Sequence, residues 1–150
     1  MRAITIEEIL VHIERFENSL TVFFDKIHDE THDEGARLLT DYIARHRHRT
    51  LAALDKCPHE MVDHIKKLPL QYQPDIPGEH TFKEIKLPQD ATPLEILEAA
   101  IAFDECMVQM YKQIAGQPVA HEIKDLFENL SVYEGADEID LKKIRQMFLR

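Results

Sequence analysis

The sequence predicts an all-α protein built from four long amphipathic helices. Only 4 of its 150 residues are Gly and 7 are Pro, too few turn-forming residues for a fold of many short strands. Apolar residues recur at intervals of three and four along most of the chain, which is the period of an amphipathic helix. A chain of this length buries one core, so we expect a single domain over 1–150.

The first half of the chain predicts two long helices. Thr5 and Glu8 form a capping box, which indicates that the first helix starts at residue 6, and its pattern runs to about residue 28. A connector over 29–35 separates it from a second helix, which Pro58 is expected to end or kink, and a short helix follows over 58–68. The apolar stripes consist of Ile9, Ile13, Leu20, Phe24 and Ile27, and of Leu39, Ile43 and Leu54.

The second half predicts a long connection and then two more helices. Five prolines fall within 69–93, and a connection of that length allows the helices on either side of it to run parallel. Thr92 and Glu95 form a second capping box, which starts a helix over 93–115. The last helix is predicted over 118–148. The layout is therefore two helical hairpins joined by a long crossover.

Every predicted helix carries an ionisable residue on its apolar stripe, near its middle. An isolated buried charge costs several kcal/mol even after the protein relaxes around it, so such groups must be paired, bound to metal or neutralised. Four independent exceptions are a poorer explanation than one polar site shared by all four helices. The residues concerned are Glu17, Arg47, Asp104, Glu134 and Asp137.

The segments around these charges follow a family pattern. They are 42–44 (YIA), 100–104 (AIAFD) with Tyr111 seven residues further on, and 126–134 (LFENLSVYE); Glu17 to Phe24 repeats the spacing of Asp104 to Tyr111. In them the chain resembles the rubrerythrin-like branch of the ferritin-like superfamily. The resemblance implies a ferritin-like four-helix bundle with a di-iron site in its core. It also implies homodimers paired along the first two helices, with His12 and Phe16 on the contact face.

The chain departs from the ligand pattern of that family, which is Glu, Glu-x-x-His, Glu and Glu-x-x-His on successive helices. Arg47 and Thr50 replace the second pair, Asp104 replaces the third glutamate, and Asp137 replaces the last histidine. Arginine stays protonated and cannot bind a metal ion, but it can bridge carboxylates through paired hydrogen bonds. We therefore expect a degenerate di-iron site, a non-catalytic protein and no cofactor.

An alternative stays open because the charges do not balance. Glu17, Asp104, Glu134 and Asp137 bring four negative charges against the single positive charge of Arg47. The excess must be protonated, reach solvent or hold a cation, and these four carboxylates could act as ligands to one Fe, Mn or Mg ion. The protein would then be a metal-binding oxidoreductase or an iron-handling protein, with an unidentified small-molecule substrate. His46, on a flanking stripe, could turn toward such a site, but a partly buried, hydrogen-bonded histidine is the simpler interpretation.

The overall composition limits partners and location. A net charge of −10 disfavours nucleic acids and anionic membranes as partners, because both repel an acidic surface. No stretch approaches the roughly 18 apolar residues of a membrane span, and the start of the chain lacks the pattern of a signal peptide. Cys57 and Cys106 form no C-x-x-C motif, which favours reduced thiols and a cytoplasmic protein.

Overall fold

The chain forms an all-helical structure, as predicted. The computed structural model describes residues 3–60, 63–85, 87–88 and 90–149, and the backbone alone for 55–60. Within these residues the only β-type pairing is an isolated bridge between Thr5 and Pro69. The helices are α1 (Ile6–Glu30), α2 (Glu34–Glu60), α3 (Asp63–Lys66), α4 (Glu79–Glu84), α5 (Pro93–Ala115) and α6 (His121–Phe148).

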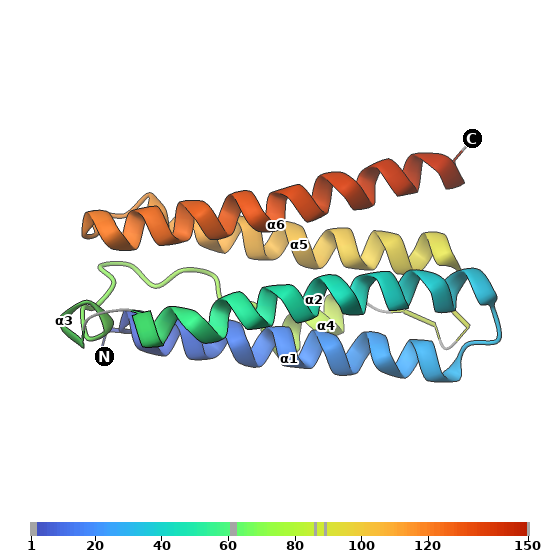
Figure 1. Ribbon diagram of the computed structural model, residues 1–150, viewed down its shortest axis with the longest axis horizontal. Helices are drawn as coiled ribbons and strands as arrows, with labels where there is room; N and C mark the ends of the chain where they lie inside the picture. Colours follow the sequence, from blue (N-terminus) through green and yellow to red (C-terminus); the bar gives the residue numbers. More distant parts are fainter. Residues whose placement is uncertain (1–2, 61–62, 86, 89, 150) are drawn as a thin grey trace.

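The four long helices lie side by side in two antiparallel pairs (Figure 1). The first pair is α1 with α2 and the second is α5 with α6, and α2 also packs against α5. In Figure 1 α2 and α5 run in the same direction, because the connection between them returns along the length of the molecule. The predicted layout of two hairpins joined by a long crossover is confirmed. Within the described residues, no helix combines the length and the apolar character needed to cross a membrane.

Both predicted capping boxes start helices. At α5, the Thr92 amide donates to Glu95 Oε1 at 3.0 Å and the Glu95 amide donates to Thr92 Oγ1 at 3.2 Å, which is the reciprocal pattern of this motif. At α1, the Glu8 amide donates to Thr5 Oγ1 at 3.2 Å, and the Thr5 hydroxyl donates to Glu8 Oε1 at 3.1 Å. The starts of both hairpins were therefore readable from local sequence.

The connector between α1 and α2 is shorter than predicted. Residues 31–33 alone separate the helices, not 29–35. Asp33 explains the early start of α2, because its Oδ1 accepts from the Ala36 amide at 2.8 Å and thereby caps the helix. The Asp33 amide in turn donates to Thr31 Oγ1 at 3.1 Å. The acidic residues of this segment, which were expected to lie in a loop, therefore lie at the ends of the two helices.

Pro58 does not end the second helix, as one of the two predicted outcomes required, and a kink at this residue stays a prediction. Helix α2 continues through Pro58 to Glu60. Of the short helix expected over 58–68, residues 58–60 belong to α2 and residues 63–66 form α3, while residues 61–62 lie outside the described part of the chain. Beyond α3, the Ile6 amide donates to the Leu68 carbonyl at 3.0 Å, which fastens the crossover to the start of α1.

The crossover contains a short helix, α4, that the sequence analysis did not predict. Its Phe82 ring packs 5.3 Å from the Phe16 ring of α1 and 5.2 Å from the Phe103 ring of α5. Phe16 is consequently only 4% exposed, so its predicted place on a dimer contact face is wrong. His12 is exposed and lines, with Phe16, a groove between α1 and the segment at α4, so its place on a contact face stays a prediction. Six helical residues among prolines are too few to produce a periodic signal.

Substitution of Phe82 tests whether α4 is held by this aromatic contact. We expect Phe82→Ala to lower the free energy of unfolding by about 2 kcal/mol, because it removes a partly buried ring from the core. The measurement is urea denaturation followed by circular dichroism. Phe148→Ala is the matched control, since that ring is 49% exposed and its loss should change stability by less than about 0.5 kcal/mol. Equal effects of the two variants would contradict the packing of α4.

Candidate functional site

Five charged side chains meet in the core, and they come from all four long helices. Glu17 belongs to α1, Arg47 to α2, Asp104 to α5, and Glu134 and Asp137 to α6. Glu17, Asp104 and Glu134 are fully buried, and Arg47 and Asp137 are 1% and 4% exposed. The predicted convergence of these residues is confirmed, while their role as metal ligands remains a prediction.

Arg47 is the centre of the cluster. Its Nη1 donates to both Glu17 carboxylate oxygens at 3.1 Å, and its Nη2 donates to Asp104 Oδ1 at 2.6 Å. Nη1 also lies 3.6 Å from Glu134 Oε2, at ion-pair range. Burial lowers the pKa of Arg47, but the charges of these carboxylates outweigh that effect and raise it. One guanidinium from α2 therefore joins α1, α5 and α6 through charged contacts.

The carboxyl groups also influence one another in two pairs, Glu17 with Glu134 and Asp104 with Asp137. Neighbouring carboxylates repel each other when both are ionised, so one member of a buried pair tends to keep a proton. Burial raises the pKa of Asp104 against the opposing effect of Arg47, and the interaction with Asp137 raises it further. Burial and the charge of Glu17 likewise raise the pKa of Glu134, to about 8. Protons on Asp104 and Glu134 thus offset the excess negative charge.

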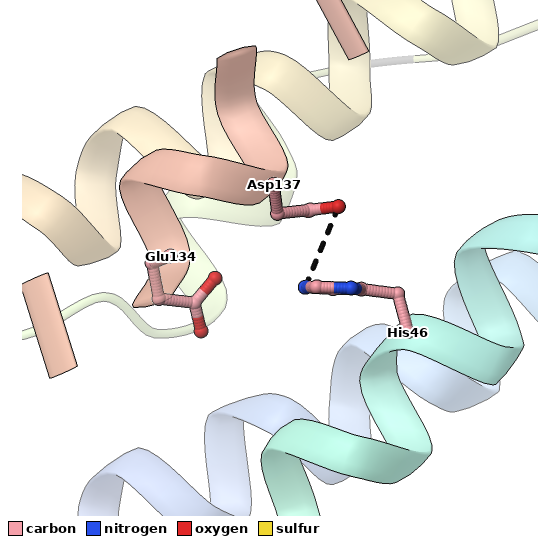
Figure 2. Close-up of side chains that lie close together, drawn as sticks. All are labelled: His46, Glu134 and Asp137. Carbon is pink, nitrogen blue, oxygen red and sulfur yellow. Dashed lines mark ion pairs between the residues drawn. The ribbon is translucent and has the colours of Figure 1, made fainter. Parts of the chain in front are cut away.

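His46 of α2 faces the α6 side of the cluster. Its Nε2 lies 3.4 Å from Asp137 Oδ1, and Figure 2 shows the Glu134 carboxylate beside the same space. One ligand atom from each of these three residues lies within 4.8 Å of the other two. The His46 ring stacks on Tyr133 with centroids 5.5 Å apart and an angle of 21° between the planes. Burial lowers the pKa of His46, although the Asp137 charge opposes this, so the imidazole is neutral near pH 7.

The four predicted carboxylates therefore divide into two sets. Glu17 and Asp104 are bonded to Arg47, whereas Asp137 lies beside His46, and Glu134 lies between the two sets. His46 was not predicted to be a site residue, because its position is about 100° around the helix from Arg47. Its spacing from Tyr42 and Leu39, which puts it on a flanking stripe, was the one sequence feature that could have indicated its place beside the site.

Several buried polar atoms in this region have no hydrogen-bond partner among the described residues. Native proteins leave few such atoms, and most instances are satisfied by water or an ion. Tyr111 is fully buried, and burial followed by the charge of Glu134 raises its pKa. The atoms are His46 Nε2, Arg47 Nε, Asp104 Oδ2, Tyr111 Oη, Glu134 Oε1 and Glu134 Oε2.

Comparison with known proteins gives no further identification. Neither the family models, nor the curated proteins, nor the solved structures searched give a match to this chain.

The raised pKa values predict an unusual pH dependence of stability. Glu134 and Asp104 bind their protons more tightly in the folded chain than the usual values of about 4 in an unfolded one. Their contribution to stability is complete below the unfolded pKa and is lost as the pH rises through the folded pKa. In chelator-treated protein we expect the free energy of unfolding to fall between pH 5 and pH 8, by roughly 1 kcal/mol per pH unit for each group.

Urea denaturation across that pH range measures the effect. Glu134→Gln, which imitates the neutral acid, should reduce the slope by about half and leave the contribution of Asp104. Glu128→Gln, an exposed position on the same helix, should keep the slope of the unmodified protein. A stability that rises steadily from pH 5 to pH 8 and is indifferent to Glu134→Gln would contradict the protonated state.

Proposed function

We propose that the chain is a ferritin-like bundle of the rubrerythrin-like type in which an arginine–carboxylate cluster replaces the di-iron site, so that it is non-catalytic. The observation that carries this proposal is the position of Arg47. Its guanidinium lies 2.6–3.6 Å from carboxylates of three other helices. Those carboxylates stand on the helices where the family pattern places metal ligands, and the layout of two hairpins and a long crossover supports the same assignment.

The residues present do not fit two metal ions. Both oxygens of Glu17 and one oxygen of Asp104 accept hydrogen bonds from Arg47, so these groups are already paired with a cation. A dication bound between them would lie close to a guanidinium that cannot lose its proton, and the two would repel each other strongly in a buried setting. A two-metal reaction with dioxygen therefore has no place in the proposal.

The cluster instead serves the architecture. A buried ion pair adds little net stability compared with apolar packing, but removing one partner leaves an uncompensated charge and is strongly destabilising. Because the partners of Arg47 belong to three different helices, shifting any one helix along its neighbours would strand a charge. We propose that this requirement sets the alignment of the four helices.

The proposal also includes a homodimer paired along α1 and α2. Val11 and Val22 of α1 are 40% and 69% exposed, and their spacing of about three helical turns puts them on one face. Val22→Asp should shift the protein toward the monomer at micromolar concentration, because it places a charge within an apolar contact. Sedimentation equilibrium measures this. Val132→Asp, on the exposed face of α6, is the control, and an unchanged mass for Val22→Asp would contradict this mode of pairing.

A second candidate function is metal binding by the remaining carboxylates, leading to an oxidoreductase or an iron-handling protein. It is favoured by the unpartnered oxygens of Glu134 and by the approach of His46 to Asp137. Elemental analysis of protein purified without chelator separates the two candidates, because two stoichiometric irons per chain would contradict the proposed role of Arg47.

Replacement of Arg47 tests the proposed cluster directly. We expect Arg47→Met to lower the free energy of unfolding at pH 7 by about 3–5 kcal/mol, because Glu17 loses its cation and Asp104 loses a hydrogen-bond donor while both remain buried. The loss should be smaller at pH 4.5, where the stranded carboxylates accept protons. Thermal and urea unfolding provide the measurement.

Two further variants sharpen that test. Arg49→Met changes an exposed arginine two residues from Arg47, about 200° around the helix from the cluster, and should alter stability by less than about 0.5 kcal/mol. Adding Glu17→Gln to Arg47→Met should recover part of the loss, because it removes one stranded charge. If Arg47→Met scarcely moves the melting temperature, the cluster does not organise the core.

A further inference from the structure

We infer that His46, Glu134 and Asp137 form a binding site for one divalent transition-metal ion, beside the Arg47 pairs and not between them. The inference rests on the proposed function in one respect, because the site is limited to one metal ion only if Arg47 occupies the other half of the cluster. This ligand set differs from the four carboxylates that the sequence suggested. It gains an imidazole from α2 and leaves out Glu17 and Asp104.

The spacing of the three side chains suits an ion. His46 Nε2 and Asp137 Oδ1 are 3.4 Å apart, yet Nε2 makes no hydrogen bond. Two ligand atoms that each lie about 2.1 Å from an ion at a tetrahedral angle are about 3.4 Å apart. The ligand atoms of all three residues lie within 4.8 Å of one another, and in Figure 2 the Glu134 carboxylate and the His46 ring border one space below Asp137.

The buried polar atoms without hydrogen-bond partners are an independent argument for a bound metal ion. Glu134 is fully buried, and neither of its carboxylate oxygens has a hydrogen-bond partner among the described residues. His46 Nε2 is unpartnered as well. One cation bound to these atoms would satisfy a Glu134 oxygen and the imidazole together. It would also balance the negative charges of Glu134 and Asp137.

The donor set selects the class of metal. One imidazole nitrogen with two carboxylate oxygens suits Zn²⁺, Fe²⁺, Mn²⁺ or Co²⁺, whereas Mg²⁺ and Ca²⁺ prefer oxygen ligands alone. The Tyr133 ring stacked on His46 holds the imidazole plane in place, which is the role that neighbouring groups play around metal ligands. Among the described residues, no other group of three His, Cys, Asp or Glu side chains comes as close together.

Arg47 limits the site to one ion. Its Nη1 lies 3.6 Å from Glu134 Oε2, so this oxygen faces the guanidinium and Oε1 is the oxygen available on the other side. On the far side of Arg47, Glu17 and Asp104 are engaged by its hydrogen bonds. A second ion would have to displace the guanidinium from both.

Titration of chelator-treated protein with Co²⁺ tests the inference, because bound Co²⁺ gives a visible absorption spectrum that reports its ligands. We expect one Co²⁺ per chain, competed stoichiometrically by Zn²⁺, with the metal content checked by mass spectrometry. His46→Ala should weaken binding at least about tenfold and change the spectrum. His48→Ala is the matched control, since His48 is exposed two residues away on the same helix, and it should bind as the unmodified protein does.

The outcomes separate this inference from the proposed function. Absence of stoichiometric Co²⁺ binding, or equal binding by His46→Ala and the unmodified protein, would overturn the metal site. The proposed role of the Arg47 cluster would remain testable through the effect of Arg47→Met on the free energy of unfolding. If His46→Ala were unfolded by circular dichroism, Asp137→Asn, which keeps the side-chain volume, replaces it with the same expected loss. A second Co²⁺ bound alongside a His46-dependent one would support the site and contradict the replacement of the di-iron centre by Arg47.

Discussion

The structure depends on the contact of one buried guanidinium with carboxylates from three neighbouring helices. Arg47 is 1% exposed and cannot shed its charge, so the core tolerates it only with Glu17 and Asp104 in hydrogen-bonding range. The same carboxylates, equally buried, would be as costly without Arg47. Each side of this contact therefore requires the other, and the four long helices are bound to a common alignment. Its energetic value lies in the penalty for disruption more than in net stability.

The cluster is asymmetric, and only one of its two halves is available to bind a ligand. Arg47 serves the α1 and α5 side, where charges are paired by short contacts. On the α6 side, Glu134 and Asp137 exceed the positive charge available and face a neutral imidazole from His46. When no cation is bound, protons on Asp104 and Glu134 offset the excess negative charge. A bound metal ion could offset that charge in place of the protons. The two halves of one polar site thus have different roles, one structural and one available for ligand binding.

Packing around the cluster explains why these charges interact strongly. Phe16 and Phe103 adjoin Glu17 and Asp104 in the sequence. Their rings and that of Phe82 pack together with centroids 5.2–6.0 Å apart. Burial in such surroundings excludes water, strengthens electrostatic interactions and raises the cost of any unpaired group. The short helix α4 contributes Phe82 to this packing, so the crossover helps to close the core as well as connecting two hairpins.

The sequence alone determined the helical class, the two capped helix starts and the residues of the core site. Periodicity shows which side chains share a helix face, and capping depends on neighbours within one turn, so both are local properties. Tertiary structure decided what local patterns do not contain. It buried Phe16 beneath Phe82, turned His46 toward Asp137, and divided four similar carboxylates between Arg47 and His46. Those outcomes depend on distances between residues far apart in the chain, which only the packing of whole helices sets.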